Sequence, residues 1–156
     1  RTPFRFEGHA RRALLEAKFR GVTAHLDVLA AAVAEVVPQE WRVDVIVPVP
    51  LHAGRRRKRG YNQSDELAKG IARILGTRVH RGLVVREAAG RPQASLNAAQ
   101  RAVNAREVYT GRGVPPPRVL LVDDVSTTGS TLDAIAALLK RAGAERVYAV
   151  AVTRED

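Results

Sequence analysis

Cysteine and methionine are absent from the 156-residue sequence, and aromatic side chains make up only 4% of it. Without cysteine, these residues can form no disulfide and hold no metal through thiolates, which is compatible with a reducing compartment. A core with so few aromatic rings must be built from Val, Leu, Ile and Ala. Long apolar runs are also missing: residues 28–37 are the most apolar stretch, and they include Glu35. Because a spanning helix needs about 20 apolar residues, no membrane span is expected.

The beginning of the chain shows no secretory signal, because residues 1–20 carry scattered charges and no apolar segment. We therefore expect a cytoplasmic protein. The length favours a single domain over residues 1–156. The net charge of +10 predicts attraction to phosphates, nucleic acid or acidic partners, and an Arg-rich composition that serves solubility is an equal alternative. The positions of the charges therefore carry more information than their sum.

Short apolar strands alternate with helical patterns along the chain. Residues 43–47, 119–122 and 147–152 are expected strands that are apolar almost throughout, and residues 83–85 form a weaker one. Strands that are apolar on both faces are typical of a parallel sheet covered by helices. The sequence therefore predicts an α/β fold with a central parallel sheet flanked by helices. The expected helices span residues 9–20, 24–37, 63–75, 96–107 and 130–142, with a Gly- and Pro-rich turn over residues 111–117.

Two acidic residues, Asp123 and Asp124, directly follow the apolar strand 119–122. The carboxyl end of a parallel strand is where ligands bind, and carboxylates there can accept hydrogen bonds from hydroxyls or meet a divalent cation. The next residues form a hydroxyl-rich loop that opens a helix, and free N–H groups at a helix start suit an anion. An acid pair beside such a cradle fits ribose 5-phosphate, whereas an Asp N-cap before a Ser/Thr-rich helix start is the alternative. The expected phosphate-binding residues are Ser126, Thr127, Thr128, Gly129, Ser130 and Thr131.

A run of five cations, residues 55–59, follows the strand that ends near Pro50. Such a run is usually a solvated loop. At the mouth of a parallel sheet, however, its cations can neutralise a leaving pyrophosphate. We expect His52, Arg55 and Arg59 to bind pyrophosphate, and a structural role for His52 is equally open.

The segment 119–131 resembles the signature by which type I phosphoribosyltransferases bind phosphoribosyl pyrophosphate (PRPP). This resemblance implies that Asp123 and Asp124 hold the ribose hydroxyls as the catalytic acids and that the loop holds the 5-phosphate. A second set of residues resembles the ComF family of competence-associated phosphoribosyltransferase-like proteins and extends the likeness over nearly the whole chain. These are residues 48–52, Arg55 and residues 59–63, followed by Arg86, Pro92, Gln93, Leu96, Arg101 and Asn104.

The resemblance also implies a loop that closes over the substrate and excludes water from the reacting centre. Its expected members are Arg86, Arg91, Gln93, Arg101 and Asn104. Arg101 and Asn104 share one face of an expected helix, and pinning the loop is as open for them as touching the substrate. Members of the family commonly begin with a four-cysteine zinc-binding segment. Since the chain lacks cysteine and does not begin with Met, we expect that segment upstream, with its natural loss as the alternative.

The function implied by the resemblance is transfer of ribose 5-phosphate from PRPP to an unidentified base, with release of pyrophosphate. Mg²⁺ is the expected cofactor, bound mainly through the oxygens of PRPP with help from Asp123 and Asp124. The alternative is a non-catalytic module that senses PRPP or nucleotides, or binds single-stranded DNA in competence. That alternative ranks second because the basic run has no aromatic residue apart from Tyr61 on which bases could stack. The acceptor base and the oligomeric state, a homodimer included, stay open.

Overall fold

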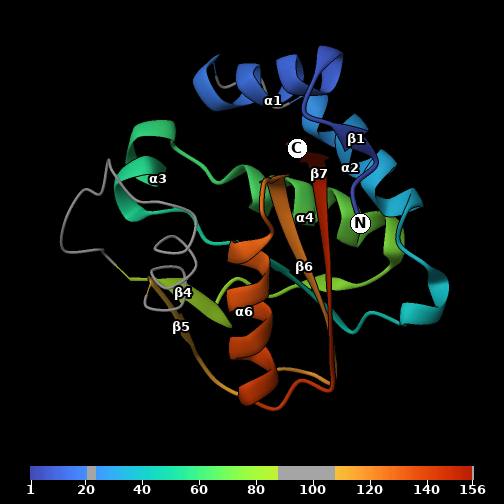
Figure 1. Cartoon of the computed structure of the whole chain (residues 1–156), viewed down its shortest axis with the longest axis vertical. Helices are drawn as coiled ribbons and strands as arrows, with labels where there is room; N and C mark the ends of the chain where they lie inside the picture. The colour runs from blue at the N-terminus through green and yellow to red at the C-terminus, as the bar shows by residue number, and fades with distance from the viewer. Residues whose placement is uncertain (21–23, 88–107, 156) are drawn as a thin grey trace.

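The computed structural model describes residues 1–20, 24–87 and 108–155. A central sheet of parallel strands has the order β1-β7-β6-β2-β3 (Figure 1). A separate antiparallel ribbon pairs β4 with β5. The predicted central parallel sheet is therefore confirmed. The strands are β1 (Phe4–Arg5), β2 (Val45–Pro48), β3 (Arg78–Val79), β4 (Val84–Arg86), β5 (Tyr109–Gly111), β6 (Arg118–Ser126) and β7 (Arg146–Arg154).

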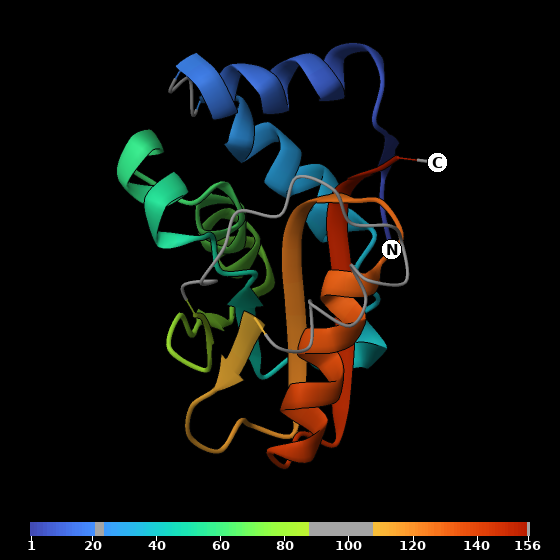
Figure 2. The ribbon, with the colours of Figure 1, turned by 60° about the vertical axis from the view of Figure 1, so that its left-hand side comes forward.

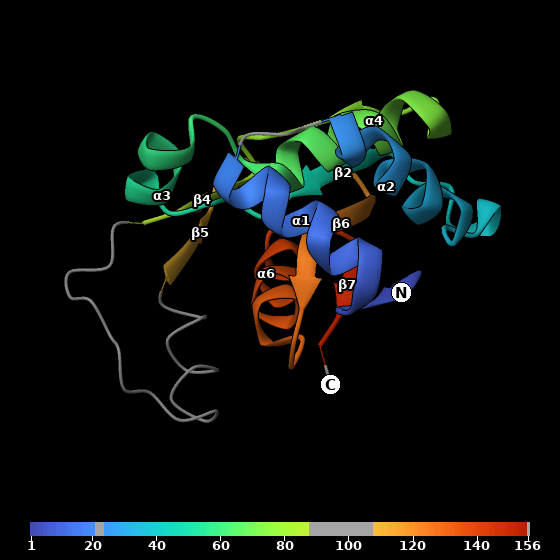
Figure 3. The ribbon, with the colours of Figure 1, turned by 90° about the horizontal axis from the view of Figure 1, so that it is seen from above.

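Helices cover both faces of the sheet, as the apolar strands predicted. Seen from above, α2 and α4 lie on one face and α6 on the other (Figure 3). The β4–β5 ribbon packs on the same side as α6, and α1 crosses above the carboxyl ends of the strands (Figures 1 and 2). The helices are α1 (Gly8–Arg20), α2 (Ala24–Glu35), η1 (Gln39–Trp41), α3 (Ala53–Arg59), α4 (Gln63–Leu75) and α6 (Ser130–Arg141).

The sheet separates two aliphatic cores. Leu120 and Val122 of β6 face the core beneath α2 and α4, whereas Val119 and Leu121 face the core beneath α6. Burial on both faces explains why β6 is apolar at every position from Val119 to Val122. On the first side α2 and α4 meet closely at Gly70, where an added Cβ would lie 2.6 Å from the Ala30 Cβ.

Several elements differ from the sequence predictions. The strand predicted to end at residue 122 continues to Ser126, because the long last strand stays paired with it. The cationic run predicted as a loop is the helix α3. There the His52 Nδ1 caps the helix by accepting a hydrogen bond from the Gly54 N–H at 3.1 Å, and Gly60 is the C-cap after Arg59. Arg is a good helix former, so a run between two caps becomes helical.

Three short strands, β1, β3 and β5, were not predicted, and β5 takes in Gly111 of the expected turn. Two or three residues are too few to show a period, so no pattern in the sequence marks them. The helix predicted over residues 96–107 lies outside the described residues. Within the part of the chain that the structure describes, no helix has the length and apolar character that crossing a bilayer requires.

Candidate functional site

The site lies where β6 extends beyond the carboxyl end of its neighbour β2. The ladder between these strands runs from Val45 opposite Val119 to Pro48 opposite Val122. Beyond Val122, β6 keeps its register with β7 as far as Ser126. The acid pair predicted at a strand end therefore lies on an overhanging part of β6, beside the end of β2.

Hydrogen bonds from the protein hold both carboxylates of this pair. The Asp123 Oδ1 accepts from the Ser64 hydroxyl at 3.1 Å and from the Asp124 N–H at 2.9 Å. The Asp124 Oδ1 accepts from the Val125 N–H at 2.8 Å. Ser64 itself is only 4% exposed, whereas the two acids are partly buried. Each carboxylate is thus oriented by the protein at a position that solvent can still reach.

The loop after the acids turns sharply into α6. Gly129 is the residue before the helix and has a φ of 78°, a backbone conformation that residues other than glycine rarely adopt. Its carbonyl accepts the Asp133 N–H at 2.9 Å. The Thr128 hydroxyl donates to the Ser130 hydroxyl at 3.0 Å and receives the Ser130 N–H at 3.4 Å. Backbone N–H groups and hydroxyls gather at the positive end of the helix, as an anion cradle requires.

A cavity of about 230 Å³ opens beside this loop. Three loop residues, Thr127, Thr128 and Gly129, form part of its wall, and Arg154 at the end of β7 contributes from the neighbouring strand. Leu132 of α6 closes another side. The loop therefore borders a space with a cationic residue at its edge.

The residues expected to bind pyrophosphate lie on or next to α3. His52 acts as the N-cap described above, so the structural role that the sequence left open for it is present. The Arg59 guanidinium donates to the Gln63 side-chain oxygen at 2.9 Å. Arg55, Arg56 and Arg57 are exposed on the helix surface. Arg55 is therefore the expected pyrophosphate ligand that faces solvent.

Arg86, expected to belong to the closing loop, is the last residue of β4 and pairs with Tyr109 of β5. Its guanidinium lies 5.6 Å from the centre of the Tyr109 ring, and among the described residues no hydrogen-bond partner reaches its buried Nε. Tyr109 is 7% exposed. Burial raises the pKa of Tyr109, with Asp123 adding to the rise while Arg86 and Arg55 oppose it. The ribbon thus brings Tyr109 close enough to Asp123 of the acid pair and to Arg55 of α3 for their charges to affect its pKa.

The remaining members of the expected closing loop, Arg91, Gln93, Arg101 and Asn104, lie outside the described residues. Within the described ranges there is also no cluster of three or more His, Asp or Glu side chains arranged to hold a metal ion.

Residues 26–155 match the phosphoribosyl transferase domain family. The chain belongs to this family. Competence protein F of Haemophilus influenzae is 36% identical over 135 residues, covering 84% of this chain and 59% of that protein. The DNA utilization protein YhgH of Salmonella typhi is 37% identical over 130 residues, covering 76% of this chain and 57% of that protein. These matches confirm the predicted resemblance to the ComF family, and the chain spans somewhat more than half of each relative.

A solved structure with a similar fold is the glutamine PRPP amidotransferase from B. subtilis, complexed with ADP and GMP. It superposes with a TM-score of 0.56 at 24% identity, over 83% of this chain and 26% of that chain. An identity this low establishes the fold alone. The predicted type I phosphoribosyltransferase-like architecture is confirmed.

The family match includes the carboxyl ends of β2 and β6, where the site of this phosphoribosyl transferase domain lies. It leaves out α1 and β1, which precede residue 26.

The sequence analysis missed two residues near the acid pair, Ser64 and Tyr109. Ser64 sits in an ordinary helix start, where a serine usually has only a local role. Tyr109 is one of three tyrosines in the chain, and that rarity was the available signal.

Proposed function

We propose that this domain binds PRPP together with Mg²⁺ at the carboxyl ends of β2 and β6 and transfers the ribose 5-phosphate unit to a base. The observation that carries this proposal is the pairing of two oriented carboxylates with an anion cradle on one short segment. Asp123 and Asp124 suit sugar hydroxyls, and the loop that turns at Gly129 on the same strand-to-helix segment suits a phosphate. A ribose 5-phosphate presents these two chemistries at its two ends.

In the proposed reaction, the bond between C1 of the ribose and the pyrophosphate oxygen breaks, and its electron pair leaves with pyrophosphate. A ring nitrogen of the acceptor base forms the new bond to C1 and gives up its proton. The chain contributes by orientation and electrostatics: the acids hold the ribose hydroxyls, and residues 126–131 hold the phosphate. Arg55 and Arg59 on or at the end of α3 stabilise the negative charge that develops on pyrophosphate.

Mg²⁺ would neutralise charge on the pyrophosphate of bound PRPP. Two neighbouring carboxylates supply only part of an octahedral set, which fits an ion that keeps several waters and takes phosphate oxygens as its other ligands. Asp123 and Asp124 are the residues of this chain that would hold it, directly or through water.

Isothermal titration with PRPP, in the presence and absence of Mg²⁺, tests the binding step. We expect Asp124→Asn to weaken PRPP more than inorganic phosphate, because the acid serves the hydroxyl end. Asp44→Asn is the matched control, since Asp44 lies before β2 at the opposite end of the same sheet and should leave both affinities unchanged. Equal losses for both ligands, or no binding of PRPP at all, would contradict the proposal. A screen of bases for pyrophosphate release then tests the transfer.

A second function is favoured by one observation on the surface. Arg55, Arg56 and Arg57 are exposed along α3, and the relatives named above include a competence protein and a DNA utilization protein. We therefore also consider a module in competence that binds single-stranded DNA through α3. The salt dependence of DNA binding separates this function from the first.

A further inference from the structure

We propose that Ser64 is a positioning residue that fixes the Asp123 carboxylate for the ribose hydroxyls of the ligand. This inference rests on the proposed function of the site. It assigns the first turn of α4 a role in ligand recognition that neither the family match nor the motif at residues 119–131 points to.

The first observation is that β2 ends before β6 does, so within the described part of the chain the last residues of β6 have no strand beside them on that side. Up to Val122 the strand is held on one side by β2, and the Val49 N–H adds a last hydrogen bond to the Val122 carbonyl at 2.9 Å. The Asp123 carboxylate lies just beyond the end of this ladder, and its Oδ1 accepts a hydrogen bond from the Ser64 hydroxyl of α4 at 3.1 Å.

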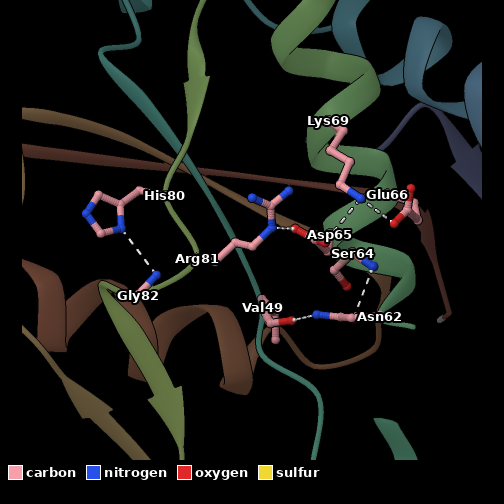
Figure 4. A network of polar contacts seen from close by, with 9 residues as sticks. All are labelled: Val49, Asn62, Ser64, Asp65, Glu66, Lys69, His80, Arg81 and Gly82. Atoms are coloured by element: carbon pink, nitrogen blue, oxygen red, sulfur yellow. Dashed lines mark hydrogen bonds and ion pairs between the residues drawn. The ribbon is translucent and has the colours of Figure 1, made fainter. Parts of the chain in front are cut away.

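The second step is how Ser64 is itself held. The Asn62 side chain caps α4 by accepting the Ser64 N–H at 3.3 Å, and its Nδ2 donates to the Val49 carbonyl at 2.9 Å (Figure 4). A continuous line of hydrogen bonds thus runs from the end of β2, through Asn62 and Ser64, to the carboxylate on β6. Because Ser64 is almost fully buried, its hydroxyl has little freedom to turn toward water.

Ion pairs on the outer surface hold the same helix start in place. The Arg81 Nε lies 2.6 Å from the Asp65 Oδ1, which ties the segment after β3 to the residue next to Ser64 (Figure 4). Lys69 bridges to Glu66 at 2.6 Å one turn further along α4. The position of Ser64 is therefore set by contacts on both of its sides.

The consequence for ligand binding concerns only one end of the ligand. A carboxylate that is already oriented loses less entropy when it accepts hydrogen bonds from a sugar, so its preorganisation appears as affinity for the sugar part. The hydrogen bonds between Thr128 and Ser130 in the anion cradle at residues 126–131 are local and do not involve Ser64. Removal of the Ser64 hydroxyl should therefore change the preference for ribose 5-phosphate over inorganic phosphate.

The test is an equilibrium titration of Ser64→Ala with ribose 5-phosphate and with inorganic phosphate. A hydrogen bond to a charged group predicts a loss of about tenfold in the affinity for ribose 5-phosphate, with the affinity for phosphate unchanged. Thr77→Ala is the matched control, because the Thr77 hydroxyl donates to the Asp44 carbonyl at 3.0 Å beyond the other end of α4. It removes a comparable hydroxyl far from the acids and should leave the ratio of the two affinities unchanged.

A double-mutant cycle shows whether Ser64 acts through Asp123. In the Asp123→Ala background, Ser64→Ala should lower the affinity for ribose 5-phosphate no further. Ser64→Cys keeps the size of the side chain but has a weaker donor, so its affinity for ribose 5-phosphate should lie between those of wild type and Ser64→Ala. This variant also provides the test if Ser64→Ala does not fold. Two results would overturn the inference about Ser64 and leave the proposed function standing. One is an unchanged ratio of the two affinities in a folded Ser64→Ala variant. The other is a full further loss of ribose 5-phosphate affinity when Ser64→Ala is added to Asp123→Ala. Failure of the wild-type chain to prefer ribose 5-phosphate to phosphate would overturn the proposed function as well.

Discussion

The Asp44 carboxylate holds Arg118 through both of its oxygens. Oδ1 accepts from the guanidinium Nη2 at 2.6 Å, and Oδ2 accepts from Nε at 3.1 Å and from the Arg118 N–H at 2.9 Å. The Asp44 N–H in turn donates to the Arg118 carbonyl at 3.0 Å. This pair joins the amino ends of β2 and β6, at the end of the sheet opposite the acid pair, and so stabilises the pairing of the two strands away from the site.

The Arg118 guanidinium lowers the pKa of Asp44 below its ordinary value, first of all through the side-chain hydrogen bond. A carboxyl whose pKa is lower in the folded state stabilises the fold above its unfolded pKa of about 4, and this contribution disappears as the pH falls through the folded pKa. We therefore expect wild type to be more stable than Asp44→Asn at pH 7 and the difference to shrink as the pH falls below about 4. Thermal unfolding of both chains across this range checks it; a difference that grows on acidification would contradict it.

The contact between Gly70 of α4 and Ala30 of α2 predicts an effect on stability away from the site. An added Cβ at residue 70 would lie 2.6 Å from the Ala30 Cβ, so Gly70→Ala must push the helices apart. Overpacking of this kind costs about 1–3 kcal/mol, from which the better helix propensity of Ala recovers up to about 1 kcal/mol. We expect a net destabilisation in urea unfolding. The double variant Ala30→Gly with Gly70→Ala should regain part of the loss, whereas no recovery would show that the cause lies elsewhere.

The fold was predictable because its main signals are long. Strands buried on both faces, such as residues 119–122, are apolar at every position, and the periodic helix over residues 63–75 has the predicted bounds. The motif also located Asp123 and Asp124. What the sequence could not show was the partner of each group. Ser64 and Asp123, which form a hydrogen bond, are 59 residues apart in the sequence. The influence of Arg55 and Arg86 on the pKa of Tyr109 depends on a ribbon of two short strands.

The conformation of Gly129 separates anion binding from general stability. A side chain at a φ of 78° costs about 1–2 kcal/mol, so Gly129→Ala should distort the loop and weaken binding of inorganic phosphate. Gly113 has a similar φ of 74° in the turn after β5. Gly113→Ala is therefore the matched control, expected to lower stability by a similar amount and to leave phosphate affinity unchanged. Equal phosphate affinity for both variants in a titration would show that the loop is not the anion site.

The helical form of the cationic run makes a prediction about DNA. Arg55, Arg56 and Arg57 follow one another in α3, and successive residues of a helix point about 100° apart, so one strand of DNA cannot contact all three at once. Five contacts by residues 55–59 would give a log–log slope of affinity against salt near −3.5, at about 0.7 counterions per contact with single strands. We expect a slope near −1, reflecting weak attraction to a chain of net charge +10. Binding of a short oligonucleotide at several salt concentrations measures it.

Single substitutions on α3 then distinguish the two functions of this surface. If the helix serves pyrophosphate, Arg55→Glu should lower the affinity for PRPP and change DNA binding little. Arg57→Glu, at an exposed residue on another side of the same helix, should spare PRPP. Charge reversal alters the net charge equally in both variants, so nonspecific attraction to the chain falls by the same amount in each. A salt slope steeper than about −3 that is abolished by neutralising residues 55–59 would instead mean that these cations track a nucleic-acid backbone, and it would favour the DNA-binding function over PRPP transfer.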